Sequence, residues 1–328
     1  MNDITAGILA SLCRSGAFIS GEDLCRGFSI TRSAVWKHIG LLRDSGYRID
    51  AVTGKGYRLT GLSGRPVEAE VGMFLETVLL GKNFIYQEEA VSTNRLARAL
   101  AQDGAPEGTV VAADSQTGGR GRMGRSWVSP PGVNLYFSLI LRPGLPSIRI
   151  PQLTLLVAAA IHRALRHHLP ALEPKVKWPN DILLKGRKVC GVLCEMQSEP
   201  DLTHFVVAGV GINVNQSLFS ADLQHRATSL SLEAGTPFSR PQLLAGVLNH
   251  FEPLYLEWLG KDDLSFIVPY LEEHSFLNAK EVTIDQLRQS LSGTVTGIAP
   301  GGELTLQGPG GRLMLVSSGE AHIRKDQS

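Results

Sequence analysis

The spacing of apolar and polar residues over the first sixty positions predicts three short helices followed by a β-hairpin. Apolar residues recur at helical intervals before Gly16, and a helix-start signal at residues 20–23 opens a second helix. A third helix begins near Thr31. The two strands of the hairpin then follow over residues 47–52 and 57–59.

This order of elements is that of a winged helix-turn-helix, whose third helix enters the major groove of DNA while the wing touches backbone phosphates. Three-helix units also serve as protein-binding modules, so the order alone leaves both interpretations open. The polar face of the third helix favours DNA, because it carries residue types that reach phosphates and base edges. The candidate DNA-contacting residues are Thr31, Arg32, Ser33, Trp36, Lys37 and Lys55. Trp36 is equally compatible with a packing role.

From the linker at residues 60–66 to about residue 275, strands and helices are mixed. Helical periodicity covers residues 93–102, 151–169 and 241–259. The candidate strands are 109–113, 133–141, 176–178, 182–184, 189–195 and 205–214. Because several strands follow one another without a crossover helix, we expect an α+β domain with a mixed or largely antiparallel sheet.

After residue 278 the pattern changes to short strands separated by Gly-rich turns, which is typical of a small barrel. The candidate strands are 282–284, 293–298, 304–307, 313–317 and 320–323. The chain is therefore predicted to be an α+β multidomain protein. We expect a DNA-binding domain over residues 1–64, a ligand-binding domain over 65–274 and a C-terminal domain over 275–328.

Composition narrows the class of protein further. A chain of 328 residues exceeds one ordinary core and suggests two or three domains. A net charge of +1 argues against non-specific coating of nucleic acid, so any DNA contact must come from a local patch. No membrane span, secretory signal or C-x-x-C pair is evident in the sequence. We therefore expect a cytoplasmic protein with reduced cysteines, no zinc site and no membrane partner.

Residues 118–127, here called the arginine loop, place arginines among glycines and end in Trp127. Glycine lets the backbone turn tightly, so that its N–H groups can close around a phosphate. Arginine supplies a permanent charge and a fork of donors. We expect the loop to be mobile by itself and to become ordered around an anion. A solvated, Gly-rich connection is the alternative interpretation.

Four further segments place polar groups where a core would not. Residues 91–94 hold three small hydrogen-bonding side chains at a helix start, where a capping role is the alternative. In residues 177–181 a turn explains the proline, asparagine and aspartate, but it does not explain Lys177. Lys188 opens a buried strand. Residues 209–215 carry two glycines two positions apart, which indicates close approach of another group to that backbone.

Together these segments supply a polyanion loop, a second cationic group, a carboxylate for Mg²⁺ and asparagines suited to a base edge. This set fits a nucleotide and a small carboxylic acid, and the matching reaction is acyl-adenylate formation. In that reaction a carboxylate attacks the α-phosphate of ATP, while cationic groups and Mg²⁺ stabilise the charge on the phosphates. No Ser/His/Asp or Cys/His arrangement is evident in the sequence, which argues against a covalent enzyme intermediate.

With these residues identified, the whole chain resembles the bifunctional biotin protein ligase and biotin operon repressor family. The motifs that carry the resemblance are residues 119–125, 177–181, 191–195 and 211–213. The resemblance implies an N-terminal winged helix-turn-helix, a central domain like that of class II synthetases, and a C-terminal SH3-like β-barrel. Met123 and Cys194 depart slightly from the family pattern, and a buried cysteine can serve as a small hydrophobe.

The resemblance also assigns roles to individual residues. The implied biotin-binding residues are Ser92, Thr93, Asn94, Gln116, Gly119, Arg120, Gly121, Arg122, Lys188 and Gly191. The implied nucleotide-binding residues are Asn180, Asn213, Arg122 and Lys188. The implied catalytic residues are Lys188, Arg120, Arg122, Lys177 and Asp181. Asp181 is further expected beside Mg²⁺ or beside the incoming lysine amine.

The activity implied by the resemblance is that of a biotin–[biotin carboxyl carrier protein] ligase. Such an enzyme uses ATP and Mg²⁺ to form biotinyl-5′-AMP and transfers biotin to a lysine of the carrier domain of acetyl-CoA carboxylase. Its repressor members form a homodimer promoted by biotinyl-5′-AMP and bind operator DNA of the biotin synthesis genes. Ordering of the arginine loop by the adenylate would favour a dimer that needs the ordered loop.

Three alternatives remain open at the level of the sequence. A ligase whose winged helix no longer binds DNA would show the same motifs, because arginine, serine and lysine fit solubility as well as readout. A lipoate-type ligase would share the central fold and the reaction. A regulator that merely senses biotin would need no catalysis, although the intact loop, Lys177, Asp181 and Lys188 argue against a dead site.

Overall fold

The computed structural model describes residues 3–286 and 289–324, so the outermost ends of the first and third predicted domains lie outside the described residues. The chain forms two compact units. One contains the residues up to Leu75 together with Ser239–Ala245, and the other contains Glu76–Phe238 and the residues from Gly246 onward. The predicted division into three domains remains a prediction.

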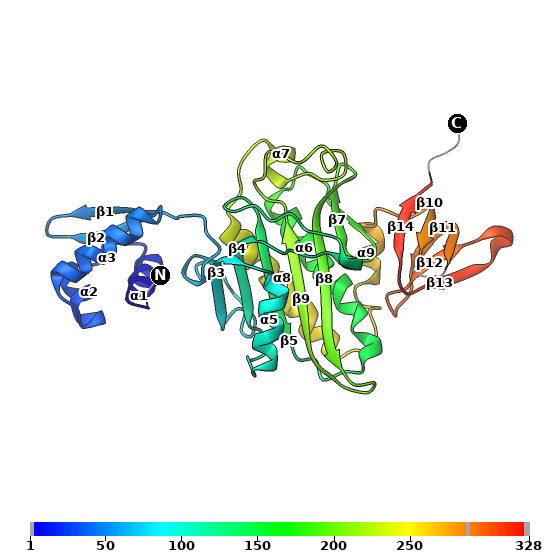
Figure 1. The fold of residues 1–328 in the computed structure, drawn as a ribbon, viewed down its shortest axis with the longest axis horizontal. Helices are drawn as coiled ribbons and strands as arrows, with labels where there is room; N and C mark the ends of the chain where they lie inside the picture. Colours follow the sequence, from blue (N-terminus) through cyan, green and yellow to red (C-terminus); the bar gives the residue numbers. More distant parts are fainter. Residues whose placement is uncertain (1–2, 287–288, 325–328) are drawn as a thin grey trace. The chain divides into compact units, whose positions relative to one another are not determined.

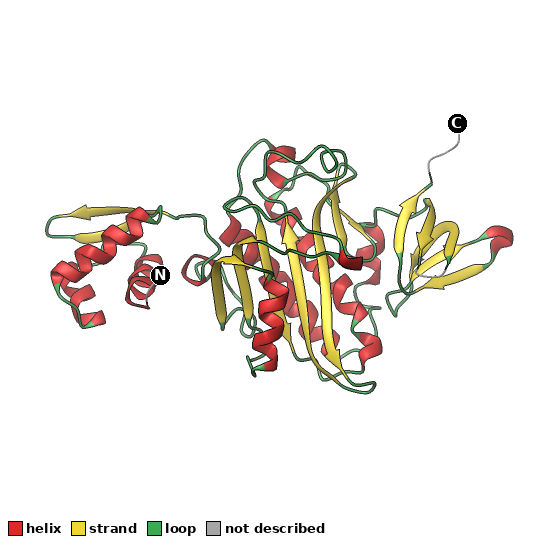
Figure 2. Cartoon of the chain, viewed as in Figure 1, coloured by secondary structure: helices red, strands yellow, loops and turns green. Residues whose placement is uncertain are grey.

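The first unit contains the predicted three helices and hairpin in the predicted order (Figure 2). Its elements are α1 (Asp3–Ser15), α2 (Gly21–Phe28), α3 (Arg32–Asp44), β1 (Arg48–Val52), β2 (Gly56–Gly61) and α4 (Glu68–Val71). Hydroxyl caps define two of the helix starts. The Ser20 Oγ accepts from the Asp23 N–H at 3.0 Å, and the Thr31 Oγ1 accepts from the Ala34 N–H at 3.3 Å.

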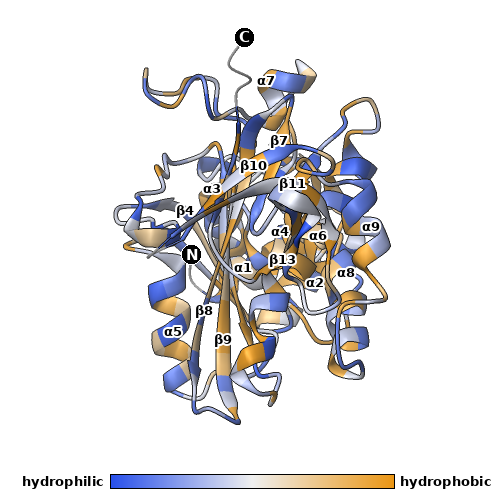
Figure 3. Ribbon diagram, turned by 90° about the vertical axis from the view of Figure 1, so that its right-hand side faces the viewer, coloured by the Kyte–Doolittle hydropathy of each residue, from blue (hydrophilic) through white to orange (hydrophobic). Residues whose placement is uncertain are grey.

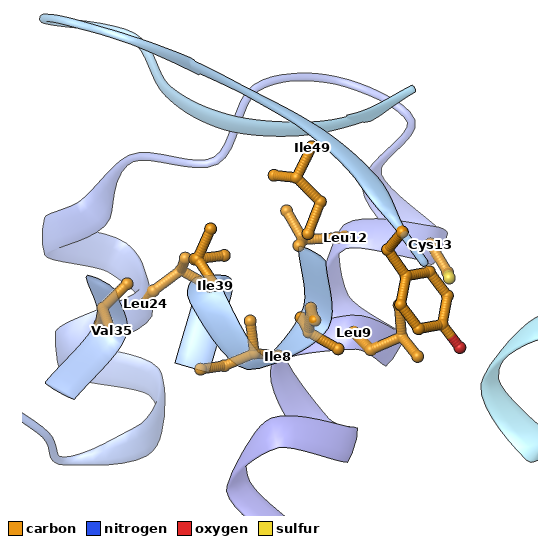
Figure 4. Close-up of a cluster of buried hydrophobic side chains, with 10 residues drawn as sticks. Ile8, Leu9, Leu12, Cys13, Leu24, Val35, Ile39 and Ile49 are labelled. Carbon is orange, nitrogen blue, oxygen red and sulfur yellow. The ribbon is translucent and has the colours of Figure 1, made fainter. Parts of the chain in front are cut away.

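The core of this unit lies between α1, α3 and the hairpin. Figure 4 shows Ile8, Leu9 and Leu12 of α1 packed among buried side chains of the other elements, including Ile39 and Ile49. The opposite face of α3 is exposed. Trp36 is 71% exposed, so it contributes nothing to this core, and the other candidate DNA-contacting residues are exposed as well.

A buried carboxylate fixes the segment that follows the hairpin. Glu70 is fully buried and accepts hydrogen bonds from the Ser63 N–H and Oγ and from the Gly64 N–H. The Gly64 carbonyl accepts from the Arg240 Nε at 3.0 Å. Gly64 has a φ of +76°, a conformation that favours glycine. The predicted linker is thus a hydrogen-bonded turn.

The second unit is built on a seven-stranded sheet with the strand order β3-β4-β5-β9-β8-β7-β6. The strands are β3 (Phe84–Ala90), β4 (Val110–Gln116), β5 (Leu135–Leu141), β6 (Lys175–Lys177), β7 (Asp181–Leu184), β8 (Arg187–Ser198) and β9 (Thr203–Ile212). Only the β3–β4 pair among these is parallel, so the expectation of a mixed sheet is confirmed. Strand β3 was not predicted, because it is a half-exposed edge strand whose three apolar residues at the start are followed by polar ones.

Helices cover both faces of this sheet, as the edge-on view in Figure 3 shows for α5 and α6. The helices of the remaining chain are α5 (Thr93–Gln102), α6 (Pro151–His168), α7 (Leu230–Ala234), α8 (Arg240–Leu259) and α9 (Val268–Glu273). Short 3₁₀ turns are η1 (Arg122–Gly124), η2 (Ser147–Arg149) and η3 (Pro309–Gly311). Ala97 and Ala101 of α5 pack on Val111, Ile140 and Phe205 of the sheet.

The other face of the sheet is covered by α6. By length and composition the stretch Ser147–His168 could cross a membrane, with a mean hydropathy of 1.2 over its most apolar window. However, 72% of that window is buried inside the protein. Figure 1 shows α6 running behind the strands, which is the position of a core helix.

The C-terminal strands form a separate five-stranded antiparallel sheet with the order β13-β12-β11-β10-β14. Its strands are β10 (Glu281–Asp285), β11 (Ser290–Ile298), β12 (Leu304–Gln307), β13 (Leu313–Val316) and β14 (Glu320–Ile323). All five were predicted. The sheet is attached to the rest of the second unit by the Trp178 Nε1, which donates to the Gly302 carbonyl at 3.0 Å.

Candidate active site

A cavity of about 780 Å³ lies at one end of the seven-stranded sheet. It gathers almost every residue that the sequence analysis assigned to ligands. The predicted residues in its lining are Ser92, Thr93, Asn94, Gln116, Arg120, Gly121, Arg122, Lys177, Asn180, Asp181, Lys188, Gly191 and Asn213. Gly119 is not part of the lining. A Cβ on Gly119 would lie 2.5 Å from the Trp127 carbonyl oxygen, so glycine is required there by a crossing backbone.

One side of the cavity, here called the strand wall, carries Lys177, Asp181 and Lys188. The Lys188 Nζ lies 2.6 Å from the Asp181 Oδ1. A tight turn between β7 and β8, with Lys185 and Gly186 at positive φ, brings the two residues together. The Lys188 backbone also pairs with the Arg226 carbonyl and the Thr228 N–H, so both sides of its strand are hydrogen-bonded.

Lys177 ends β6 and pairs in the strand ladder with Asp181. The turn that follows is held from two directions. Trp178 is buried and reaches the C-terminal sheet, and the Asn180 Nδ2 donates to the Val192 carbonyl at 3.0 Å. Neighbouring strands therefore place two lysines and one carboxylate on one side of the cavity.

The opposite side is the arginine loop, which folds back on itself. Arg120 forms a bridge with Ser126, and the Gly121 N–H donates to the Arg125 carbonyl at 2.7 Å. Met123 and Gly124 make the turn at positive φ. A backbone closed in this way aims the side chain of Arg122 back across the cavity.

Arg122 links the two sides. Its Nη1 donates to the Asn180 Oδ1 at 3.0 Å, and its Nη2 lies 3.4 Å from the Gly319 carbonyl. Burial lowers the pKa of the Arg122 guanidinium below its ordinary value, while Asp181 and Glu320 act in the opposite direction. A half-buried arginine with these partners does not fit a merely solvated connection.

Polar side chains close the inner end of the cavity. The Gln116 Oε1 accepts from the Thr93 N–H at 2.9 Å and from the Thr93 Oγ1 at 3.2 Å. The Ser138 Oγ donates to the Asn94 Oδ1 at 2.7 Å. Ser92 occupies the N-cap position of α5 but makes no side-chain capping bond, so the capping interpretation of this hydroxyl is wrong.

The floor of the cavity is formed by β9, where Gly209 and Gly211 present backbone without a side chain. A Cβ on Gly211 would lie 2.6 Å from the indole of Trp127, and a Cβ on Gly209 would overlap the Asn94 side-chain amide. The close approach predicted for these glycines is thus confirmed. Trp127 also lies under the Lys188 ammonium, 5.3 Å from the ring centroid.

Some residues of the cavity were not identified from the sequence. Trp127 lines the cavity, and its Nε1 is buried without a hydrogen-bond partner in the described part of the chain. Its place at the end of the arginine loop was the signal that could have identified it. Further lining residues are Phe219, Leu223, His225 and Arg226, from a segment with no periodicity or motif.

The Asn213 side chain is tied to that same segment, because its Nδ2 donates to the Thr228 carbonyl at 3.0 Å. Among the described residues, no group of three or more His, Cys, Asp or Glu side chains could hold a metal ion. The carboxylates in the lining are Asp181 and Glu320. Any metal here would take most of its ligands from a bound molecule.

Comparison with known proteins gives one consistent result. Residues 87–213 match the Biotin/lipoate A/B protein ligase family, and residues 7–58 match an HTH domain. The chain is 44% identical over 244 residues to the bifunctional ligase/repressor BirA of Bacillus subtilis, covering 74% of this chain and 75% of that protein. It is 31% identical over 272 residues to the protein of that name from Escherichia coli, covering 83% and 82%.

A solved structure gives the same result. The chain is similar to the biotin protein ligase from Aquifex aeolicus in complex with biotin and ATP, with a TM-score of 0.65 at 29% identity. The match covers 75% of this chain and all of that chain.

Proposed function

The chain belongs to the family of bifunctional biotin protein ligases and repressors, and on this premise we propose that it activates biotin with ATP and attaches it to a carrier protein. We further propose that it is a biotin-responsive repressor of biotin synthesis genes. The observation that carries the ligase proposal is the convergence of Lys188, Arg122 and a polar inner end on one cavity.

In the first half-reaction a carboxylate oxygen of biotin attacks the α-phosphorus of ATP, the bond to the β-phosphate breaks, and pyrophosphate leaves. Lys188 binds the biotin carboxylate and the α-phosphate, where charge accumulates. Arg120 and Arg122 cover the phosphate and the biotin from the arginine loop. Ser92 and Gln116 bind the polar end of biotin, supported by the hydrogen bonds at the start of α5.

The remaining residues of the cavity have simpler roles in this proposal. Thr93 and Asn94 hold the inner end of the site in place, Gly121 and Gly191 offer backbone close to biotin, and Asn180 and Asn213 face the adenine. Lys177 lies where it can neutralise a leaving phosphate. Gly119 does not contact biotin in this proposal; it lets the backbone of the arginine loop pass close to Trp127.

Mg²⁺ fits this site as a companion of ATP. One carboxylate, Asp181, would bind it, and the phosphates would provide further ligands, which is the usual arrangement for this ion. There it would supply charge neutralisation for the leaving pyrophosphate. When no ion is near, Asp181 stays paired with Lys188 and orients its ammonium.

In the second half-reaction the Nζ of an acceptor lysine attacks the acyl carbon of biotinyl-5′-AMP, an amide forms, and AMP leaves with the bonding electrons. The amine must lose a proton, and Asp181 is the carboxylate that lines the cavity next to Lys188. The acceptor is the biotin carboxyl carrier domain of acetyl-CoA carboxylase.

The repressor function rests on the first unit. Arg32, Ser33, Trp36 and Lys37 lie on the exposed face of α3, and Lys55 lies at the tip of the hairpin. Thr31 caps α3 at the start of the same face. The biotinyl-5′-AMP complex forms a homodimer whose two copies bind the two halves of an operator.

The same proposal covers the architecture and location of the protein. The central domain, over residues 65–274, has the class II synthetase-like fold, and the five C-terminal strands form an SH3-like barrel over residues 275–328. The winged helix-turn-helix occupies residues 1–64. The protein works in the cytoplasm.

The deciding experiment incubates the full chain with ATP, Mg²⁺, labelled biotin and a biotin carrier domain. We expect label to be transferred to the carrier lysine, with pyrophosphate released only when biotin is present. Lipoate in place of biotin is the comparison for a lipoate-type ligase. Biotin binding without pyrophosphate release would indicate a sensor instead of an enzyme.

DNA binding is tested separately by gel shift with the upstream region of the biotin genes. We expect a shift that requires both ATP and biotin. Active ligation without any shift would identify a ligase whose winged helix does not bind DNA.

A further inference from the structure

We infer that Glu320, in the C-terminal sheet, is a positioning residue that holds the arginine loop over the adenylate site through Arg125. This inference rests on the proposed function, because it concerns the loop of the same site. It divides the arginines of the loop into two kinds. Arg120 and Arg122 act on the ligand, whereas Arg125 anchors the loop.

The contact between Arg125 and Glu320 is a two-pronged ion pair. The Arg125 Nη1 donates to the Glu320 Oε1 at 2.7 Å, and the Nη2 pairs with the Oε2. This geometry occupies both prongs of the guanidinium fork. The pair holds the pKa of the Glu320 carboxyl below its usual range and raises that of Arg125. One N–H of each Arg125 Nη is therefore committed to Glu320.

The backbone beside Glu320 supports the same arrangement. The Gly319 carbonyl lies 3.4 Å from the Arg122 Nη2, so one turn of the C-terminal sheet contacts two arginines of the loop. Gly319 has a φ of +141°, and a Cβ there would lie 2.5 Å from the Ile284 Cγ2. Only glycine allows the turn to reach the loop in this way.

The anchor is fixed to the rest of the second unit. The Trp178 indole donates to Gly302, the Phe276 N–H donates to the Val176 carbonyl at 2.8 Å, and the Glu272 carboxylate accepts from the Ile298 N–H at 2.9 Å. These contacts join the C-terminal sheet to the turn that ends in Asn180 and Asp181. The position of Glu320 is thus set relative to the strand wall.

The pairing of charges around the cavity agrees with this division between arginines that act on the ligand and the arginine that anchors the loop. Each carboxylate in the lining is paired, Asp181 with Lys188 and Glu320 with Arg125. Arg122 has no carboxylate partner at hydrogen-bond distance among the described residues, and its side chain bonds to Asn180 of the strand wall instead. Fixing Arg125 to Glu320 at the rim of the loop orders the loop in advance, and this lowers the entropy lost when Arg122 closes on a ligand.

The test uses Glu320→Gln in the full chain, which keeps the shape and removes the charge. We expect the adenylate to be released about three- to tenfold faster and the KM for ATP to rise by a similar factor, with kcat nearly unchanged, as suits a partly exposed two-pronged pair. The double variant Arg125→Glu, Glu320→Arg should restore both values. The matched control is Asp50→Asn, which breaks the exposed pair with Arg58 in the hairpin of the first unit.

A readout independent of catalysis separates the two proposals. The arginine loop contains trypsin sites, and we expect Glu320→Gln to be cut there faster than the unmodified chain and faster than the control. Unchanged release, unchanged KM and unchanged cleavage in Glu320→Gln would overturn the anchor. Faster cleavage in a chain that never forms an adenylate would uphold the anchor and reject the proposed function.

Discussion

The strand wall and the arginine loop face each other across one cavity but are built in different ways. In the wall, Lys188 and Asp181 lie on consecutive strands joined by a tight turn, and the ladder sets their distance. In the loop, Arg122 bonds to a residue 58 positions away and Arg125 to one 195 positions away. The wall is therefore local and bound into a sheet, whereas the loop depends on distant contacts.

This difference suggests a division of labour. Groups on neighbouring strands are held tightly, which suits the stabilisation of charge at one atom. A glycine-rich segment held by side chains can open and close at low cost, which suits retention of an intermediate. Substitutions in the wall should accordingly affect the chemical step, and substitutions in the loop should affect release.

The largest expected effect is in the wall. Lys188→Ala should lower the rate of biotin-dependent pyrophosphate release by about 10²–10³-fold, the range for loss of one pre-placed charge-stabilising group. The control is Lys185→Ala, three residues earlier, whose ammonium pairs with Glu233 outside the predicted site. Pyrophosphate release undiminished in Lys188→Ala, measured with the fold intact by circular dichroism, would remove Lys188 from the mechanism.

The next effect is in the loop. Arg122→Gly should speed release of biotinyl-5′-AMP by roughly 10–100-fold, because one charge-assisted hydrogen bond contributes about 1.5–3 kcal/mol. The measurement is the lifetime of labelled adenylate on the protein, together with labelling of bystander lysines. Met123→Ala, at an exposed position of the same loop, is the control. A lifetime equal to that of the unmodified chain would show that the loop is no lid.

The third effect concerns the floor, where the wall and the loop meet. Gly211→Ala should weaken biotin binding by roughly tenfold, since a Cβ there would displace the indole of Trp127 and overpacking typically costs 1–3 kcal/mol. Calorimetric titration with biotin measures it. Gly27→Ala, where a Cβ meets nothing within 4 Å, is the control. Equal biotin affinities of Gly211→Ala and Gly27→Ala would show that the Trp127 indole can shift without weakening biotin binding.

The last effect is on stability and leaves activity at neutral pH unchanged; it concerns a histidine that supports the wall. His162 is fully buried, and its ring bonds to the Pro174 carbonyl just before β6 and to the Tyr270 hydroxyl. Burial lowers the pKa of His162 to about 4. The unfolded chain therefore binds a proton first as the pH falls from about 6.5, and the free energy of unfolding decreases by at most about 1.4 kcal/mol per pH unit until about pH 4.

His162→Gln should remove this part of the pH dependence, measured by urea unfolding at several pH values. The control is His204→Gln, which removes an exposed histidine. If the free energy of unfolding falls with pH by the same amount per pH unit in the unmodified chain and in His162→Gln, His162 contributes nothing to the acid sensitivity of the unit.

The same contrast explains what could be predicted from the sequence. Lys188, Asp181 and the floor glycines were identified, because strand patterns and turn residues act over a few positions. Strand β3 was missed, because this half-exposed edge strand has only three apolar residues at its start and polar residues after them. The capping of α5 by Gln116 instead of Ser92 depends on a residue two dozen positions away.

Glu320 illustrates the limit most clearly. Nothing in the residues around it signals a role, since its partner lies 195 positions earlier in the chain. Only folding of the C-terminal sheet against the turn at Trp178 brings the two together. Side chains whose partners are set by tertiary structure cannot be found by reading neighbours in sequence.

The position of Trp127 has an optical consequence. Its indole lies in the cavity, against Gly211 and under the Lys188 ammonium. Trp36, by contrast, is exposed to water, and Trp258 is buried in a helix core. The wavelength and intensity of Trp127 emission depend on the dielectric and the charge beside the ring, so occupancy of the cavity carries its own fluorescence signal and needs no added dye.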